Sequence, residues 1–239
     1  MDTSSERGKL YLVPTPISEE SIDHIAESVR EIVARAHHFI VETQRTGRRQ
    51  VKALAPNKQL DSCTWAEWNK KTPPELLNGL LDPALRGEDI CLLSDAGSPT
   101  IADPGAPVVS LAHRKGVPVM PLSGPSAILL ALMASGFQGQ RFAFHGYLPP
   151  QKGSRRQELK KLERSAYQGI TQIFMETPYR NQQMLTSVLS TCQSDTMFCV
   201  ACNLGSAQAF IRTQSIHVWK QTQLPDLHKK PCIFLLSNT

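Results

Sequence analysis

The chain has 239 residues, of which 41% are hydrophobic and 20% are charged, and its formal net charge is +5. This length allows a real core in one large domain or two small ones, and the balance is that of an ordinary soluble protein. The first residues lack the layout of a signal peptide and no apolar run approaches the length of a membrane span. Composition therefore argues against a secreted or membrane protein, and we expect a cytoplasmic one.

The N-terminal half alternates short apolar runs with helical patterns. In chain order the sequence predicts a strand over Lys9–Val13, a helix over Glu19–Arg35, a strand over Phe39–Glu42, a basic loop, an irregular stretch over Thr64–Lys71, a helix over Pro73–Leu85, a strand over Ile90–Leu93, a helix over Pro104–Lys115 and a strand over Val117–Met120. This succession predicts a mostly parallel sheet with right-handed crossovers.

The C-terminal half has consecutive strands without helices between them. The expected elements are a helix over Pro125–Ser135, a strand over Arg141–His145, a basic helix after the turn Gly146–Pro150, a strand over Thr171–Glu176, a helix over Pro178–Ser190, and strands over Met197–Cys202, Phe210–Val218 and Pro231–Leu236. Such a succession favours an antiparallel or mixed sheet. We therefore expect an α/β protein of two domains, residues 1–120 and 121–239.

Two turns rich in glycine and proline carry most of the functional information. SDAGSPTIADPG (Ser94–Gly105) and PLSGPSAILLALMASGF (Pro121–Phe137) each follow a predicted buried strand. Ligands of open α/β sheets bind outside the carboxyl ends of the strands, where glycine lets the backbone approach closely. Each turn also contains a helix-start signal, Asp103 before Pro104 and Gly124 before Pro125. We therefore expect both turns to line a ligand site.

Several common chemistries are excluded by missing motifs. The first strand ends in Val13-Pro14-Thr15-Pro16, so the glycine fingerprint of a dinucleotide fold is absent, and neither a P-loop nor a GxSxG elbow occurs. The six cysteines are scattered. Although Cys199 and Cys202 have CxxC spacing, their apolar setting indicates a core strand. With no clustered histidines either, we expect no metal site.

Positive charge is concentrated in two segments, Arg45–Arg49 and Lys152–Lys161. Basic clusters are the usual footprint of nucleic-acid binding. A solvated helix face is a serious alternative for the second segment, because Leu159 and Leu162 supply an apolar side. Charge alone slightly favours RNA.

Taken together, these motifs resemble the tetrapyrrole-methylase superfamily of S-adenosylmethionine-dependent methyltransferases. Within it they are most similar to the group of small-subunit ribosomal RNA methyltransferase I. The matching segments, in the family's order, are Gly8–Ile17, Ser94–Pro99 with Asp103–Gly105, Ser123–Gly136, Gly146–Pro149 with Lys152–Arg156, and Glu176–Arg180. Each motif alone is weak, whereas five in the correct order are specific.

The resemblance implies two α/β domains with S-adenosylmethionine in a cleft between them, usually in a homodimer, and methylation of a ribose 2′-hydroxyl of ribosomal RNA in the small subunit. Methyl transfer depends on positioning, and a ribose hydroxyl needs a base or a stabilising cation. The implied catalytic residues are Glu42 and Arg45. The implied cofactor-binding residues are Pro14, Ser94, Asp95, Ala96, Gly97, Ser98, Pro99, Ile101, Ala102, Asp103, Ser123, Gly124, Pro125, Ser126, Ala127, Met175 and Glu176. The implied RNA-binding residues are Arg48, Arg49, Lys152, Arg155, Arg156 and Arg180.

Polar motifs nearer the substrate depart from the family pattern, as at Thr43-Gln44, Trp65–Asn69 and Cys202–Gly205. Two further function classes therefore stay open: an enzyme acting on a tetrapyrrole or other small molecule, and a non-catalytic RNA-binding relative. Glu176 and Arg180 could also simply pair with each other. Trp65 and Trp68 could stack on bases, although core packing is the commoner role of such residues.

Overall fold

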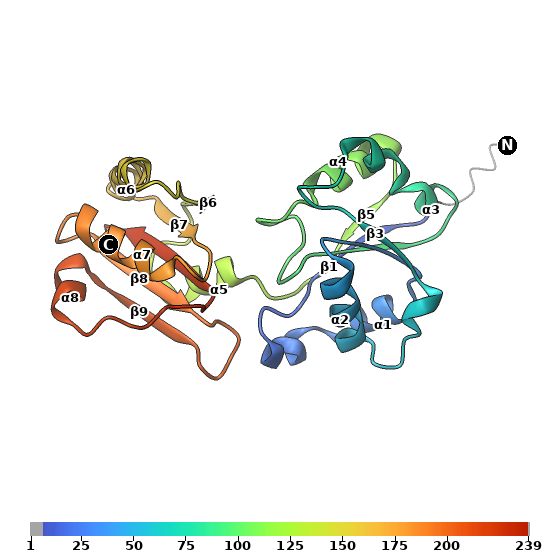
Figure 1. The fold of residues 1–239 in the computed structure, drawn as a ribbon, viewed down its shortest axis with the longest axis horizontal. Helices are drawn as coiled ribbons and strands as arrows, with labels where there is room; N and C mark the ends of the chain where they lie inside the picture. Colours follow the sequence, from blue (N-terminus) through green and yellow to red (C-terminus); the bar gives the residue numbers. More distant parts are fainter. Residues whose placement is uncertain (1–6, 239) are drawn as a thin grey trace. The chain divides into compact units, whose positions relative to one another are not determined.

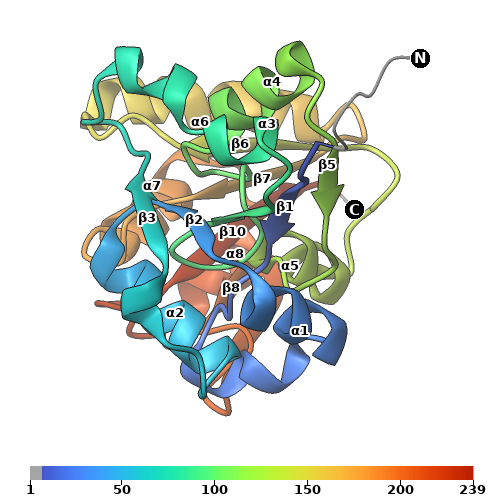
Figure 2. The ribbon, with the colours of Figure 1, turned by 90° about the vertical axis from the view of Figure 1, so that its right-hand side faces the viewer.

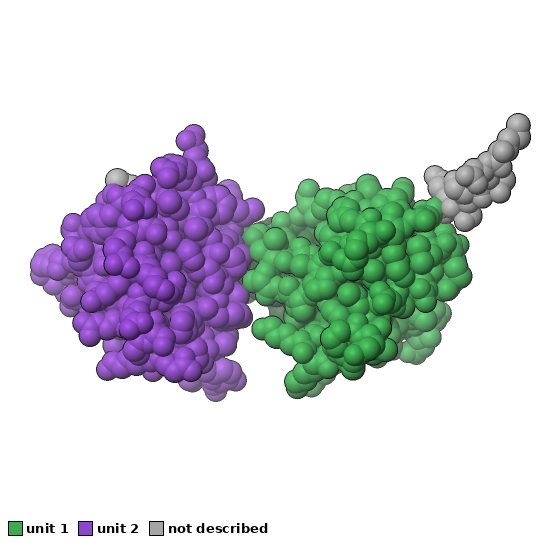
Figure 3. Space-filling model, turned by 90° about the horizontal axis from the view of Figure 1, so that it is seen from above, with its two compact units in different colours: residues 1–126 green, residues 127–239 purple. Residues whose placement is uncertain are grey.

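The computed structural model describes residues 7–238, and the chain forms two compact units (Figures 1 and 3). The first unit ends at Ser126 and the second begins at Ala127. The sequence placed this division after Met120, within a strand that pairs in the first sheet. Within residues 7–238 no helix is long and apolar enough to cross a membrane.

The first unit is built on a five-stranded sheet in the order β3-β2-β4-β1-β5, in which every pair is parallel. Its strands are β1 (Leu10–Val13), β2 (His38–Val41), β3 (Thr64–Glu67), β4 (Ile90–Leu93) and β5 (Val119–Pro121). Side chains alternate between two cores: Val13, Val41 and Leu93 face one side, and Leu10, Ile40 and Leu92 face the other. Parallel sheets need both faces covered, which explains why these strands are almost continuously apolar.

Helices cover both faces of this sheet (Figure 2). One face carries α1 (Glu27–Arg35) and α2 (Gln44–Leu54), and the other carries α3 (Asp82–Leu85) and α4 (Ala106–Lys115). Three short 3₁₀ segments complete the unit: η1 (Glu19–His24), η2 (Leu60–Ser62) and η3 (Pro74–Gly79). The predicted helix over Glu19–Arg35 is thus broken, because Ile25 and Ala26 have extended ψ angles of 119° and 148°.

The second unit has a mixed sheet in the order β6-β7-β10-β8-β9, in which only β6 and β7 are parallel. Its strands are β6 (Phe142–Tyr147), β7 (Thr171–Met175), β8 (Met197–Cys202), β9 (Phe210–Ser215) and β10 (Cys232–Ser237). Helices α6 (Lys152–Ala166), α7 (Asn181–Thr191) and α8 (Ile216–Gln221) cover one face, and α5 (Ala127–Ser135) covers the other. The predicted fold class, one mostly parallel and one mixed α/β domain, is confirmed.

Other predictions of local structure are wrong as well. The helix expected over Pro73–Leu85 is the 3₁₀ segment η3 and the short helix α3, and the strand expected over Phe210–Val218 ends at Ser215, where α8 follows. The expected basic loop is helix α2, and the irregular stretch contains β3, which pairs with β2 at the edge of the first sheet. The tryptophans of that stretch pack in the protein: Trp65 stacks on Phe39 with ring centroids 4.8 Å apart, and Trp68 is buried and donates to the Pro104 carbonyl at 2.9 Å.

Candidate active site

Strand β4 lies between two strands whose helices cover the opposite face of the sheet. The chain leaves β1 and β2 for helices α1 and α2 on one face, and it leaves β4 for α4 on the other. At such a switch point the loops diverge, and ligands of open α/β sheets bind outside the carboxyl ends of the strands. The loops that begin at Pro14, Glu42 and Ser94 therefore frame the candidate site.

The loop after β4 is fastened to the loop after β1. The N–H of Thr15 donates to the Gly97 carbonyl at 2.9 Å, and the N–H of Gly97 donates to the Thr15 carbonyl at 3.1 Å. The hydroxyls of Thr15 and Ser94 also reach the Gly97 carbonyl, at 3.4 and 3.0 Å. Gly97 has a φ of 79°, which glycine adopts without a Cβ clash. These contacts hold the predicted cofactor loop in one conformation.

The same loop contains backbone strain. Thr100 and Ala102 have φ angles of 70° and 60°, although neither is glycine. A β-branched residue in this region is an outlier, and such strain costs on the order of 1–3 kcal/mol and clusters at functional sites. The Asp103 carboxylate stabilises the loop, because its Oδ1 accepts from the N–H groups of Thr100 at 3.0 Å and Gly105 at 2.6 Å.

The predicted helix-capping roles in the two turns are wrong. Helix α4 begins at Ala106 with Gly105 as its N-cap, so Asp103 closes the loop instead of the helix. Helix α5 begins at Ala127, not at Pro125, and Ala127 is the first residue of the second unit. Both turns therefore run longer as irregular backbone than the sequence indicated, which leaves more of that backbone available to a ligand.

Three carboxyl groups gather on the loops after β2 and β4. The Asp95 N–H donates to Glu42 Oε1 at 3.2 Å, and the Asp103 carboxyl lies near enough to Glu42 to raise its pKa. Burial raises the pKa of Glu42, and the neighbouring charges of Asp95 and Asp103 raise it further, although the Asp95 amide acts against them. Burial and Asp103 also raise the pKa of Asp95, against the attraction of Arg49. Arg49 is thus the cation that acts on this acid cluster, whose members otherwise raise one another's pKa.

Two side chains that sequence reasoning missed hold this cluster. Gln50 Nε2 donates to the Asp95 carbonyl at 3.0 Å, and Asn69 Nδ2 donates to the Glu42 carbonyl at 2.8 Å. Gln50 belongs to the buried side of α2, whose members Gly47, Gln50, Val51 and Leu54 have helical spacing. That spacing is the signal that could have identified both the helix and Gln50.

The predicted arginines of α2 divide into two groups. Arg45 and Arg49 are exposed. Arg48 instead pairs with Asp61 at 2.5 Å and lies over the Trp65 ring, 5.5 Å from its centroid. Arg45 and Arg49 are thus available to a ligand, whereas Arg48 already has partners within the first unit.

The segment after β5 packs on the same edge of the first unit. A Cβ on Gly124 would stand 2.2 Å from the Cβ of Pro14, so glycine is required there for packing. Ser98 Oγ donates to the Pro125 carbonyl at 3.4 Å. A bulky substitution at Gly124 would therefore clash with Pro14 whether or not a cofactor binds, and it does not test cofactor contact.

In the second unit the predicted cofactor residues Met175 and Glu176 lie at the end of β7. The Glu176 side chain is 1% exposed, and its Oε1 accepts from the Thr177 N–H at 2.6 Å and from Arg180 at 2.7 Å. Arg180, predicted to bind RNA, is thus paired with Glu176, and its own side chain is 39% exposed. This turn neutralises its carboxylate internally.

One predicted RNA contact is wrong. Arg155 is 2% exposed on the inner side of α6, where its guanidinium donates to Ser187 Oγ at 3.0 Å and to the Pro150 carbonyl at 2.7 Å. Its spacing from Leu159 and Leu162 places it on the buried face of the helix. Arg155 therefore anchors α6, whereas Lys152 and Arg156 are exposed.

Comparison with known proteins places this arrangement in a family. A model of the tetrapyrrole (corrin/porphyrin) methylases matches residues 9–216. The chain belongs to this family. The resemblance inferred from the ordered motifs is thereby confirmed.

Curated relatives of this methylase-family chain include two bacterial proteins named ribosomal RNA small subunit methyltransferase I. The protein from Vibrio cholerae is 34% identical over 183 residues, which cover 75% of this chain and 59% of the relative. The protein from Halalkalibacterium halodurans is 34% identical over 189 residues, with coverages of 77% and 60%. The matched region thus spans about 60% of the length of these relatives.

Solved structures of tetrapyrrole methyltransferases share the fold. The methyltransferase CobJ superimposes with a TM-score of 0.64 at 15% identity, covering 97% of this chain and 95% of CobJ. A uroporphyrin-III C-methyltransferase from Thermus thermophilus, complexed with S-adenosyl homocysteine, gives 0.58 at 17% identity, with coverages of 96% and 97%. At these identities the likeness establishes the fold of this methylase-family chain.

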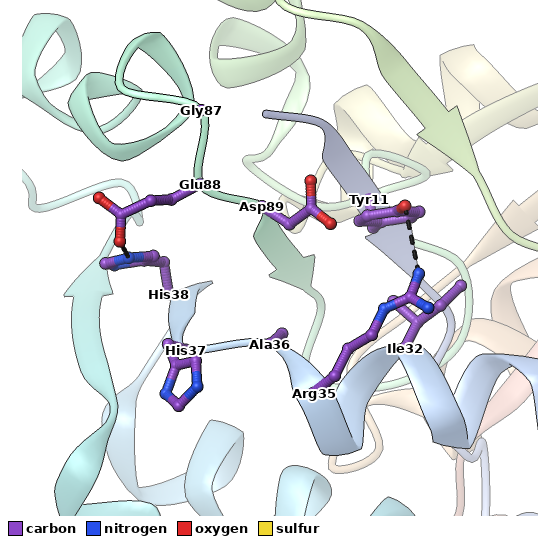
Figure 4. A pocket seen from close by; sticks show the side chains of 9 residues that line it. All are labelled: Tyr11, Ile32, Arg35, Ala36, His37, His38, Gly87, Glu88 and Asp89. Carbon is purple, nitrogen blue, oxygen red and sulfur yellow. Dashed lines mark hydrogen bonds and ion pairs between the residues drawn. The ribbon is translucent and has the colours of Figure 1, made fainter. Parts of the chain in front are cut away.

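A groove in the first unit and the CxxC cysteines of the second unit are not part of the acid cluster. A groove of about 350 Å³ lies at the amino edge of the first sheet, where Glu88 pairs with His38 at 2.7 Å and Arg35 reaches the Tyr11 hydroxyl at 3.5 Å (Figure 4). None of the predicted site residues lines it. Among the described residues no group of three or more histidine, cysteine, aspartate or glutamate side chains has an arrangement that could hold a metal ion. Cys199 and Cys202 face opposite sides of β8, so their CxxC spacing does not bring the thiols together.

Proposed function

We propose that this chain is an S-adenosylmethionine-dependent methyltransferase that acts on a ribose 2′-hydroxyl of small-subunit ribosomal RNA. The observation that carries the proposal is the acid cluster of Glu42, Asp95 and Asp103 beside a strained loop at the switch point of a parallel sheet. The names of the curated relatives support the RNA substrate. An enzyme of this kind works in the cytoplasm on ribosomal subunits, and we propose that it does so as a homodimer.

The residues beyond the carboxyl ends of β1, β2 and β4 suit the proposed cofactor. S-adenosylmethionine, when bound, supplies a methyl group on a positively charged sulfonium and carries an ammonium group besides. The gathered carboxyls of Glu42, Asp95 and Asp103 offer the negative charge that such cations favour. The irregular backbone of Ser94–Asp103 and Ser123–Ser126, with its small side chains, allows close approach. We assign cofactor binding to these two segments together with Pro14. For Ala127, Met175 and Glu176 the proposed cofactor contact rests on the family resemblance alone.

Glu42 is the proposed general base. Burial and the neighbouring acids raise the pKa of Glu42, which makes it a stronger base than an ordinary glutamate and improves proton transfer from a hydroxyl. The Asp95 N–H orients Oε1, and the Asn69 amide holds the Glu42 backbone. The exposed Arg45, in the first turn of the helix α2 that follows Glu42, supplies the positive charge that stabilises the developing alkoxide.

The RNA is held by exposed cations of both units. Arg45 and Arg49 on α2, and Lys152 and Arg156 on α6, are exposed, and we expect them to contact phosphate. Arg48 and Arg180 contribute less, because each already has a carboxylate partner. Arg155 contributes through the position of α6 and not through contact.

The test combines binding with transfer. Calorimetric titration with S-adenosyl homocysteine is expected to give a single site, and tritiated S-adenosylmethionine is expected to label small ribosomal subunits prepared from cells that lack this chain. Light scattering should give the mass of a dimer. Binding without transfer to subunits or to their naked RNA would overturn the RNA substrate, and no binding at all would overturn the enzyme.

A further inference from the structure

Helix α6 carries a continuous line of positive charge on its outer side. Lys152, Arg156, Lys160 and Arg164 follow one another at four-residue spacing, and all four are exposed. Residues four apart are neighbours on a helix surface, and twelve residues rise about 18 Å. We call these four residues the α6 stripe. In Figure 1 the helix lies at the margin of the second unit, on the face of the sheet that α7 shares.

The stripe is not neutralised by the protein. Among the described residues, none of its four members takes part in an ion pair. The helix has two glutamates, and both are engaged elsewhere: Glu158 pairs with Lys161 at 2.9 Å, and the buried Glu163 accepts from Gln193 and Thr196. Four like charges in sequence repel one another, so the stripe costs stability that folding alone does not require.

The start of the helix shows the same conflict. The first turn of α6 contains Lys152 and no acidic residue, and Gln151 makes no side-chain capping bond. A helix N-terminus carries partial positive charge and favours acids, so a lysine there is unfavourable without an external anion. Local choices that oppose the fold are expected at functional sites.

We propose that the α6 stripe binds the phosphate backbone of the RNA substrate. A line of cations about 18 Å long complements a polyanion, and backbone contact needs no base-specific geometry. An anionic membrane is a poorer partner, because the apolar residues of α6 face inward: Leu159, Leu162 and Ala166 are at most 2% exposed, which leaves no apolar face to insert. The stripe adds Lys160 and Arg164 to the predicted RNA-binding residues Lys152 and Arg156, and it omits Arg155. The choice of RNA rather than an acidic protein as the partner of the stripe rests on the proposed function.

The experiment measures affinity for a fluorescein-labelled, unstructured RNA oligonucleotide of about 20 nucleotides as a function of salt. Each lost phosphate contact lowers the slope of log affinity against log salt by about 0.7 for a single strand. The stripe variant K152Q/R156Q/K160Q/R164Q keeps residues that favour helix, and its slope is expected to fall by about 2–3 in total. The matched control K9Q/K161Q/K220Q/K229Q removes the same charge from exposed lysines off the stripe, and its slope should fall by less than about 0.7.

The outcomes separate the stripe from the methyltransferase itself. Circular dichroism and titration with S-adenosyl homocysteine establish that each variant is folded and binds as the wild type does. A flattened slope in the stripe variant alone supports the proposal. Equal flattening in both variants, or an unchanged slope in the stripe variant, overturns it, and the latter would leave an acidic protein as the partner. Wild-type RNA binding without any affinity for S-adenosyl homocysteine would overturn the proposed enzyme and leave the stripe standing.

Discussion

Glu42 and Glu176 occupy equivalent places in the two units, yet their surroundings differ. Each directly follows a strand, β2 in the first unit and β7 in the second. Glu176 is buried against Arg180 and the Thr177 amide, so its charge is neutralised within one turn. Glu42 faces two other carboxyls, and its pKa is raised. Position after a strand therefore does not identify a reactive acid, whereas the partners of the carboxylate do.

The largest expected effect is on activity, in the first unit. Glu42→Gln should lower methyl transfer by about 10²–10⁴-fold, because it removes the proposed base while keeping the shape of the side chain. Affinity for S-adenosyl homocysteine should fall by far less than transfer does, because the variant keeps the carboxyls of Asp95 and Asp103 in the cluster. The measurement is transfer of labelled methyl to small ribosomal subunits.

Glu67→Gln is the matched control for that substitution. Glu67 ends β3 and accepts from the Gln44 N–H at 2.6 Å, so it is a carboxylate on the neighbouring strand without the acid cluster. Its substitution should leave transfer within about tenfold of wild type, below the range of a lost general base. Equal losses of transfer in the two variants would mean that removal of any carboxylate near the carboxyl ends of these strands lowers the rate, and that Glu42 is not the base.

The next effect is on the stability of the second unit. Arg180→Met should lower the free energy of unfolding by about 2–3 kcal/mol, because it leaves the buried Glu176 carboxylate without its cation. Urea denaturation measures this loss. Adding Glu176→Gln to the same chain should recover most of it, since the uncompensated charge is gone.

Lys161→Met, which breaks the exposed pair with Glu158, serves as the comparison and should cost less than about 1 kcal/mol. If Arg180→Met cost no more than Lys161→Met, Glu176 would not be held by its ion pair, and the contrast with Glu42 would fail.

A smaller effect is expected from the strained loop. Thr100→Gly should raise the free energy of unfolding by about 0.5–1 kcal/mol, because relief of the positive φ exceeds the entropy cost of glycine. Asn203 in the second unit has a φ of 52°, which asparagine tolerates, so Asn203→Gly should be near neutral. Denaturation midpoints of the two variants give the comparison, and a destabilised Thr100→Gly would contradict the assignment of strain.

The sequence predicts the alternating plan of the first unit and the ligand loops because apolar periodicity and glycine-proline turns are local signals. It fails where tertiary contact decides. Gly47 and its basic neighbours indicate a loop, but a Cβ there would stand 2.4 Å from Val41 Cγ1, so the glycine serves close packing of α2 on β2. Arg155 looked like its neighbours in the basic segment, and only its register with Leu159 and Leu162 reveals a buried side chain.

The candidate site likewise has one part that the sequence predicts and another that it does not. The loop Ser94–Asp103 could be located from its residues alone. The gathering of Glu42, Asp95 and Asp103 could not, because Glu42 lies more than fifty residues from the other two and meets them through the order of strands in the sheet. The contact of the Asn69 amide with Glu42 was missed for the same reason, whereas the helical spacing of α2 could have identified Gln50 as a buried side chain.

The smallest effect is a difference in pH dependence between two glutamates of the first unit. Burial and its acidic neighbours raise the pKa of Glu42, so above its ordinary value of 4.5 the folded state binds more protons than the unfolded state. The contribution of Glu42 to the free energy of unfolding is therefore fully present below pH 4.5 and is lost as the pH rises through the raised pKa. Glu42→Gln should therefore gain stability relative to wild type as pH rises through this window. Because Glu42 is half-buried, solvent screening keeps the gain below about 1 kcal/mol.

Glu88 at the opposite edge provides the reverse sign. The hydrogen bond from His38 lowers the pKa of Glu88, so its contribution to stability is present above pH 4.5 and is lost as pH falls through the lowered pKa. Glu88→Gln should accordingly lose stability relative to wild type as pH rises toward 4.5, and it should then level off. Urea midpoints of both variants and the wild type between pH 3 and pH 7 measure the two trends. Parallel trends in the two variants would show that the change in net charge, and not the local partners of each carboxylate, sets the pH dependence of stability.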